Sequence, residues 1–160
     1  MRRKDREITD FDQIIAILQK CLVVRLGLVD DGEPYVVPLD FGYETMDGKL
    51  TLYFHSAAQG RKIDIIKVND KACFEADRFI ATVTGEKACD WSTKYESVIG
   101  FGRVSFIEDE GEQKKAMDAI MHHHGFEGEP SYPPNIFRKM ALYKMDVERL
   151  SGKSNADADR

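Results

Sequence analysis

The stretch LTLYFHSAAQGRKIDII, residues 50–66, decides the fold that this sequence predicts. Residues 50–54 are all types that favour β-strands, and Leu50, Leu52 and Phe54 alternate with Thr51 and Tyr53. The small and polar residues 55–60 are expected to end this strand. Arg61 and Lys62 then open a short helical segment that is rich in isoleucine. The stretch therefore predicts a strand, a polar turn and a helix that begins with two cations.

Cations at the start of a helix are unfavourable unless an anion lies near them, because the helix dipole is positive at that end. Free backbone N–H groups, the hydroxyl of Ser56 and the two cations Arg61 and Lys62 are together what a phosphate monoester needs. From the spacing alone, a solvated basic turn is the better interpretation.

The residues 53–57 (YFHSA), followed by 60–62 (GRK), resemble the phosphate-binding segment of FMN-binding split-barrel proteins. Within that superfamily, the chain is most similar to the 5-nitroimidazole resistance (Nim-like) branch of the pyridoxamine 5′-phosphate oxidase-related proteins. The resemblance extends from about Cys21 to Lys153. It implies that Arg61 and Lys62 hold the 5′-phosphate of FMN, because a bidentate arginine beside a lysine suits a dianion.

The resemblance also implies contacts with the flavin ring. In the family, the strand that corresponds to residues 37–41 runs under the isoalloxazine ring, and the strand at residues 95–100 reaches the flavin from the other subunit. A plain edge strand and an ordinary barrel strand are the alternatives for these two segments. Pro38 fits an edge position because it donates no hydrogen bond to a neighbouring strand. The implied cofactor contacts are Val37, Pro38, Leu39, Asp40, Phe41, His55, Ser56, Ala57, Arg61, Lys62, Ser97 and Val98.

The rest of the chain predicts mainly strands. The Asp-Gly pairs at 31–32 and 47–48 indicate tight hairpins, so the first three strands are expected to form a meander. Residues 78–90 are weakly patterned and predict a bend or loop, whereas Gly100 and Gly102 indicate strong curvature or a close neighbour. The predicted helices are 11–20, capped by Thr9 or Asp10, 60–69 and 110–123, and the predicted strands are 21–29, 35–43, 50–54, 71–77, 94–107 and 136–147.

These elements predict a six-stranded antiparallel split barrel of the Greek-key type, mainly β with a few helices. Residues 1–153 are expected to form a single domain, and residues 154–160 a polar tail. With 160 residues, 42% of them hydrophobic, the chain can build one substantial core. The net charge of -5 argues against a nucleic-acid partner.

No apolar run approaches the roughly 20 residues of a membrane span, and no signal sequence is evident. Cys21, Cys73 and Cys89 are odd in number and widely spaced, so they are expected to be buried or free thiols of a cytoplasmic protein. The run His122 to His124 is not expected to bind a metal, because successive helical residues point about 100° apart. A solvated helix end is the better interpretation, and no metal site is predicted.

The resemblance implies a homodimer in which FMN lies in the groove between the two subunits. It also implies flavin redox chemistry on a small acceptor such as a nitroimidazole, with NADH or NADPH as the electron donor. No catalytic acid, base or nucleophile can be assigned. The chain lacks the longer C-terminal substrate motif of true pyridoxamine phosphate oxidases, so oxidation of vitamin B6 is not expected. The alternatives are a flavin carrier or sensor without turnover, and a split barrel that binds haem or deazaflavin.

Overall fold

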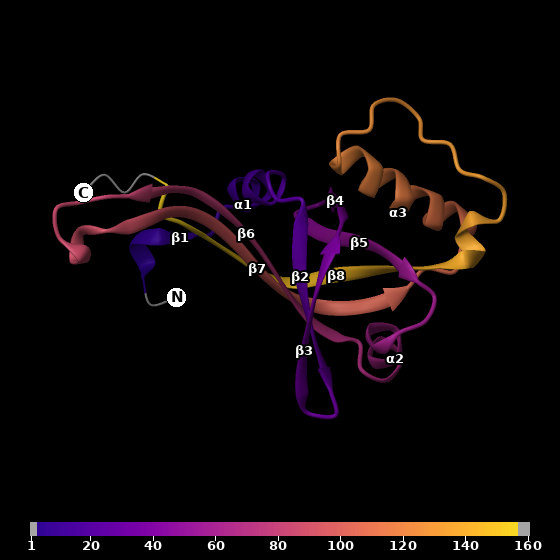
Figure 1. Ribbon diagram of the computed structural model, residues 1–160. Coiled ribbons are helices and arrows are strands. Elements are labelled where there is room, and N and C mark those ends of the chain that lie inside the picture. The colour runs from indigo at the N-terminus through magenta and orange to yellow at the C-terminus, as the bar shows by residue number, and fades with distance from the viewer. Residues whose placement is uncertain (1–2, 157–160) are drawn as a thin grey trace.

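A computed structural model describes residues 3–156 of the chain, and its elements are shown in Figure 1. No helix in this part of the chain is both long and apolar enough to cross a membrane. The helices are α1 (Phe11–Leu18), α2 (Arg61–Val68) and α3 (Glu110–His123), with 3-10 turns η1 (Lys4–Arg6), η2 (Ala88–Asp90) and η3 (Ile136–Lys139). The strands are β1 (Glu7–Ile8), β2 (Val23–Asp30), β3 (Glu33–Asp40), β4 (Gly42–Met46), β5 (Lys49–Ala57), β6 (Lys71–Val83), β7 (Ser92–Phe106) and β8 (Met140–Ser154).

The strands form one antiparallel sheet in the order β3-β2-β6-β7-β8-β5-β4, with β1 paired to β8. The sheet curls into a barrel that stays open, since its edge strands β3 and β4 do not pair with each other. The predicted class, a mainly β antiparallel split barrel, is confirmed. The number of strands is eight and not six, because β1 was not predicted and the second predicted strand is divided into β3 and β4.

The division of β3 from β4 shows that the predicted meander is wrong. β3 pairs with β2 and β4 pairs with β5, so the chain crosses from one edge of the sheet to the other at Phe41. Phe41 is fully buried there. A Cβ atom at Gly42 would collide with the backbone of Ala119 and Ile120, so the absence of a side chain lets α3 lie directly on the start of β4. The crossing is therefore fixed by a long-range contact with α3.

β3 is an edge strand with two prolines. Pro34 and Pro38 face Val29 and Arg25 of β2 in the register of the pair. An edge position was predicted for Pro38 because proline cannot donate to a neighbouring strand. The structure confirms it.

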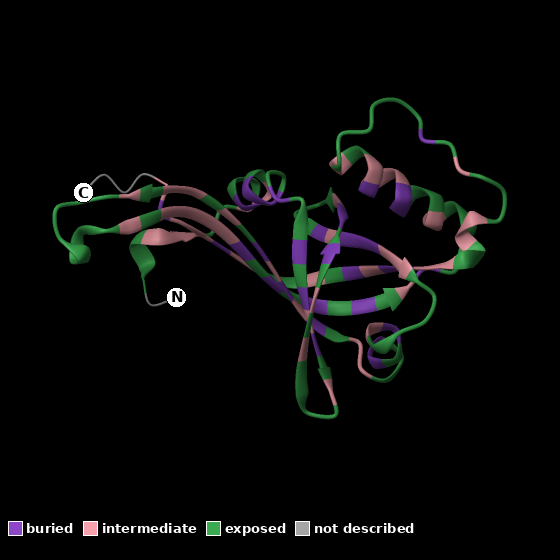
Figure 2. Cartoon of the chain, viewed as in Figure 1, coloured by how far each residue is buried: buried purple, intermediate pink, exposed green. Residues whose placement is uncertain are grey.

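β6 and β7 extend well past the barrel. β2 pairs with β6 only as far as Glu75, and beyond that point β6 and β7 continue with β8 as a projecting arm (Figure 1). The predicted loop at residues 78–90 is wrong up to Val83, because antiparallel pairing with β7 continues through a bulge between Phe79 and Ala81. Residues on the arm are mostly exposed or half-buried (Figure 2), which explains their weak pattern.

The last strand also differs from the prediction. Residues 136–139 form η3, and β8 begins at Met140 and continues to Ser154. Asn155 is buried, its amide Nδ2 donates to the carbonyl of Thr93 and its backbone N–H to the carbonyl of Tyr95. Ser154 and Asn155 therefore belong to the sheet and not to a polar tail. The remainder of the predicted tail, residues 157–160, lies outside the described residues.

The core has two parts on opposite faces of β5 and β8. The larger part fills the barrel and includes the fully buried rings of Phe41, Phe54, Phe74 and Tyr143. Burying a side chain of this size contributes about 1.5–3 kcal/mol. The smaller part lies under α3 and consists of Tyr53, Ile107, Ala116, Met117, Ile120 and Leu142.

The histidines at the end of α3 do not behave alike. His122 and His124 are exposed, as predicted for a solvated helix end, but His123 is half-buried. Its Nε2 lies 2.8 Å from the carbonyl oxygen of Cys21, and its ring centroid lies 4.5 Å from that of Phe41. Burial lowers the pKa of His123, and the Cys21 carbonyl opposes this effect. His123 thus joins the end of α3 to the start of β2.

Candidate functional site

β5 carries the first half of the predicted phosphate-binding segment. The strand does not end at His55 as expected but continues to Ala57, because its pairing with β8 extends to Ala57 and Met140. Alternation along a strand places Ser56 on the same face as Phe54, which is the barrel interior, and His55 on the opposite face. The hydroxyl of Ser56 donates to the carbonyl of Ala57 at 3.0 Å.

The second half of the segment is the start of α2. Gly60 adopts φ 131°, a backbone conformation that favours glycine. The N–H groups of Ile63 and Asp64 both donate to the carbonyl of Gly60, and no side chain caps the helix. In the described part of the chain, the N–H groups of Arg61 and Lys62 have no backbone acceptor. Such free N–H groups at a helix start can bind an anion.

Arg61 already has partners, and they all belong to the hairpin of β2 and β3. Its Nε donates to Oδ2 of Asp30 at 3.0 Å, and its Nη2 lies 3.4 Å from Oε2 of Glu33. The guanidinium carbon lies 5.0 Å from the ring centroid of Tyr35. The hydrogen bond to Asp30, more than the charge of Glu33, raises the pKa of Arg61. Lys62 forms no ion pair with any other described residue.

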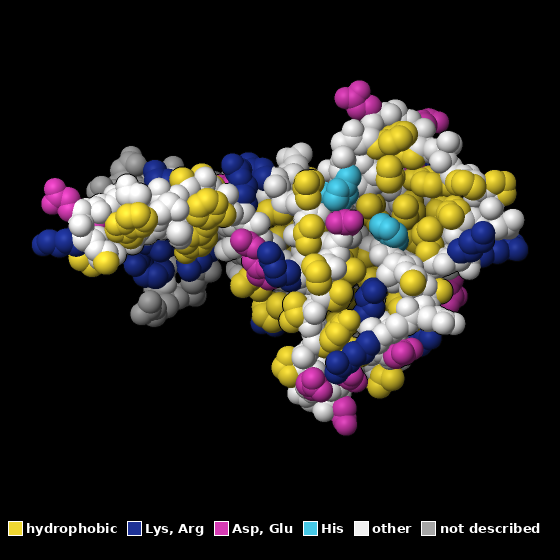
Figure 3. Space-filling view, in the orientation of Figure 1, with side chains coloured by type: hydrophobic (Ala, Val, Ile, Leu, Met, Phe, Trp, Pro, Cys, Tyr) yellow, Lys and Arg dark blue, Asp and Glu magenta, His cyan; other side chains and the backbone are white. Residues whose placement is uncertain are grey.

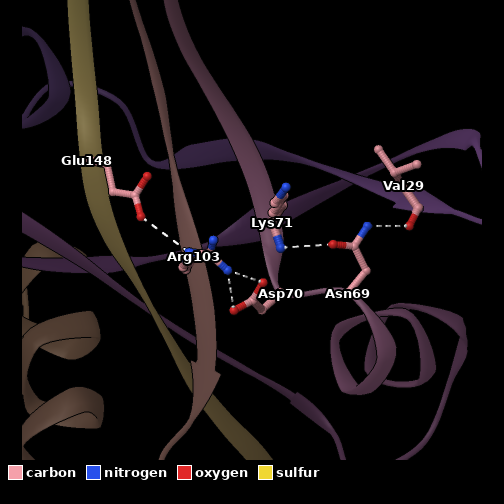
Figure 4. Close-up of polar contacts among 6 residues, drawn as sticks. All are labelled: Val29, Asn69, Asp70, Lys71, Arg103 and Glu148. Atoms are coloured by element: carbon pink, nitrogen blue, oxygen red, sulfur yellow. Dashed lines mark hydrogen bonds and ion pairs between the residues drawn. The ribbon is translucent and has the colours of Figure 1, made fainter.

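The far end of α2 is tied to the same hairpin and to the sheet (Figure 4). Asn69 donates from Nδ2 to the carbonyl of Val29 at 3.2 Å and accepts from the N–H of Lys71. The next residue, Asp70, accepts two hydrogen bonds from Arg103, whose Nε also lies 3.5 Å from Glu148. These contacts fix α2 beside the hairpin, and a groove of about 800 Å³ lies between the two.

Two buried polar atoms have no hydrogen-bond partner in the described structure: Nδ1 of His55 and the hydroxyl of Tyr143. Such atoms are rare in native proteins, and each points to a group that a bound molecule or water can satisfy. Burial raises the pKa of Tyr143 to about 12, and the hydroxyl of Ser56 acts in the opposite direction. Tyr143 therefore stays protonated at neutral pH and can donate.

The predicted ring contacts on β3 point in two directions. Pro38 and Asp40 are exposed and Val37 is half-buried, whereas Leu39 and Phe41 are buried in the core. Pro38, Asp40 and the exposed part of Val37 are therefore what a ligand outside the core could reach on this strand.

Ser97 and Val98 lie far along the sheet from the candidates at the end of β5. Ser97 is nine residues before Phe106, the β7 residue that pairs with Tyr143, a strand length of about 30 Å. Its side chain is half-buried, and that of Val98 is in the same core cluster as Leu39 and Phe41. Residues 55–57, Arg61 and Lys62 follow one another from the end of β5 to the start of α2, whereas Ser97 and Val98 lie where β7 enters the arm.

No pattern in the sequence indicates which residues contact Arg61. Asp30 was interpreted only as part of the tight turn with Asp31 and Gly32, and Glu33 was given no role. That turn is confirmed by the positive φ of Asp31 and Gly32. Their position beside α2 follows from the packing of the hairpin against the helix. Among the described residues, no group of three or more histidine, cysteine or acidic side chains is arranged to hold a metal ion.

Comparison with known proteins places this arrangement among known folds. A model of the pyridoxamine 5′-phosphate oxidase family matches residues 10–154. A candidate 5-nitroimidazole antibiotic resistance protein from Bacteroides thetaiotaomicron is 33% identical with a TM-score of 0.79, and the match covers 92% of this chain and 86% of that one. No curated protein matches the chain.

Two further solved structures share the fold at lower identity. A FAD-binding protein from Mesorhizobium loti is 23% identical with a TM-score of 0.66, over 93% of this chain and 96% of that one. A FAD- and haem-binding protein from Mycobacterium smegmatis is 17% identical with a TM-score of 0.77, over 97% of this chain and 76% of that one.

Proposed function

Because this chain belongs to the pyridoxamine 5′-phosphate oxidase family and resembles its 5-nitroimidazole resistance branch, we propose that it binds FMN and reduces small acceptors such as nitroimidazoles. The relative from Bacteroides thetaiotaomicron supports the class of acceptor. The flavin-binding relatives share the fold and are consistent with the class of cofactor. NADH or NADPH is proposed as the electron donor.

The observation that carries the proposal is the start of α2. The N–H groups of Arg61 and Lys62, which have no backbone acceptor in the described part of the chain, suit a phosphate dianion, as does the ammonium group of Lys62, which has no ion pair there. On the opposite face of β5 from Ser56, Nδ1 of His55 is buried without a partner among the described residues and can satisfy its hydrogen bond on a bound group. The residues present therefore fit FMN, with Arg61, Lys62 and Ser56 holding its phosphate and the backbone of residues 37–41 facing its ring.

FMN supplies, when bound, redox chemistry that no side chain of this protein can perform. The task of the protein is then to position the cofactor and an acceptor and to exclude water. This division of roles is consistent with the absence of an assignable catalytic acid or base. We place the protein in the cytoplasm, because its three cysteines are free thiols.

The turnover assay is anaerobic. The bound FMN is reduced chemically, a nitroimidazole is added, and the return of the oxidised flavin spectrum is followed. We expect reoxidation by nitroimidazoles, and slow turnover when NADH or NADPH is supplied. If the flavin stays reduced with every nitroaromatic tested, the nitroreductase proposal fails and the protein is a flavin carrier without turnover. A haem absorption spectrum without flavin bands in the purified protein would show that the cofactor is haem and not FMN.

We also propose that the protein is a homodimer, because Ser97 and Val98 can take part in the same flavin site as Arg61 only if a second copy supplies them. The outer face of the sheet offers apolar surface for such a contact, with Val36, Ile99 and Phe101 exposed. Light scattering after size-exclusion chromatography should give about twice the 18.2 kDa chain mass. A monomer that retains FMN would contradict the shared site.

A further inference from the structure

The β2–β3 hairpin holds Arg61 by one of the two edges of the guanidinium group that can offer a phosphate two adjacent donors. The adjacent donors Nε and Nη2 form that edge, and Asp30 occupies Nε while Glu33 occupies Nη2. The ring of Tyr35, on the same hairpin, lies near the guanidinium carbon. Three contacts from one hairpin thus surround a side chain that belongs to α2.

From this geometry we infer that Asp30 and Glu33 compete with the flavin phosphate for Arg61 and thereby set how strongly the protein prefers FMN to riboflavin. The inference rests on the proposed function and adds two residues that determine ligand specificity. A phosphate oxygen pair that binds Nε and Nη2 must displace both carboxylates, because each guanidinium N–H donates best to one acceptor at a time.

The exchange is feasible because the ion pairs are weak. The side chains of Arg61, Asp30 and Glu33 are 49%, 40% and 71% exposed, and exposed pairs contribute little to stability. Figure 3 shows acidic and basic side chains side by side at the tip of the molecule where this hairpin lies in Figure 1. A phosphate dianion carries more charge than either carboxylate, so Arg61 exchanges its two partners for the phosphate. The cost of breaking the two ion pairs lowers the net affinity of the protein for the phosphate.

The consequence is specific to the phosphate. Riboflavin has the same ring and no phosphate, so it gains nothing when Arg61 is released. Lys62, which has no carboxylate partner among the described residues, is available to a phosphate without any exchange. The two neighbouring cations therefore contribute differently: Lys62 directly, and the Nε–Nη2 edge of Arg61 only after two ion pairs are broken.

The test compares FMN and riboflavin affinities, measured by titration of flavin fluorescence in about 150 mM salt, where charges beyond about 8 Å are largely screened. The variant is Asp30→Asn combined with Glu33→Gln, which removes both charges and keeps the side-chain shapes. We expect the dissociation constant for FMN to fall about three- to tenfold and that for riboflavin to stay unchanged. Thermal unfolding confirms that the variant is folded.

The matched control is Asp31→Asn, which removes one charge from the same turn. Asp31 makes no ion pair with Arg61 among the described residues, and asparagine tolerates its φ of 47°. Asp31→Asn should change the ratio of the riboflavin and FMN dissociation constants by less than about twofold. An unchanged or weaker FMN affinity in the double variant, or an equal gain in the control, would overturn the exchange. A native protein that binds neither flavin would instead refute the proposed function, and the exchange with it.

Discussion

Replacing both cations at the start of α2, Arg61→Ala with Lys62→Ala, is expected to weaken FMN binding at least a hundredfold. Each cation can form a charge-assisted hydrogen bond with a phosphate, and the loss of one such bond costs roughly a tenfold to hundredfold in affinity. The single variants should each show the smaller loss, with Lys62→Ala at least as severe as Arg61→Ala, since Lys62 has no competing carboxylate partner among the described residues. Fluorescence titration with FMN measures all three variants.

Two controls separate this result from damage to the helix. Lys67→Ala removes an exposed cation near the other end of α2 and should leave FMN affinity unchanged. Riboflavin affinity should be nearly the same in all variants, because the proposed ring contacts lie on β3 and β7 and not on α2. An FMN affinity that survives the double replacement would show that the phosphate is not held at the start of α2.

Gly102→Ala is expected to lower the free energy of unfolding by about 3 kcal/mol, the upper end of what overpacking usually costs. A Cβ atom at Gly102 would overlap the carbonyl oxygen of Asp146 and lie 3.1 Å from Cα of Val147, both on β8. These are backbone atoms, so no side-chain rotation can make room. The melting temperature should fall by about 6–12 °C, measured at one protein concentration without added flavin.

The matched control is Gly27→Ala on β2. A Cβ atom at Gly27 would lie 3.5 Å from the carbonyl oxygen of Cys73, an ordinary contact, so this variant should melt at or slightly above the native temperature. Equal melting temperatures for the two variants would mean that β7 and β8 separate easily at Gly102. The pairing shifts register between Phe101 and Gly102, which is consistent with the close approach there.

Local signals in the sequence were enough for much of this structure. Residues 110–123 form a helix with the predicted bounds, and its N-cap Asp109 accepts from the N–H of Glu112. Asp10 caps α1 in the same way. A Cβ atom at Gly100 would overlap the ring of Phe74, so both glycines of β7 have the close neighbour that was predicted. The cations at the start of α2 were also found, because a polar turn between a strand and a helix is a local pattern.

Features that depend on packing between distant segments could not be predicted. The change of sheet edge at Phe41 requires α3, which follows about 70 residues later in the chain. The arm is weakly patterned, since residues 77–83 and 92–97 are all exposed or half-buried and no buried face enforces alternation there. The partners of Arg61 come from a hairpin about 30 residues earlier, and no property of Asp30 or Glu33 alone indicates that they meet a helix.

The prolines of β3 bear on how the protein behaves at high concentration. An open barrel leaves its two edge strands able to pair with strands of other molecules, which is a common route to aggregation. On β3, Pro34 and Pro38 have no backbone N–H, so neither can donate a hydrogen bond to an incoming strand. An incoming strand would find gaps in the ladder at both prolines. The edge beside the proposed ring contacts is thus protected against fibril-like growth while its backbone carbonyls remain accessible to a ligand.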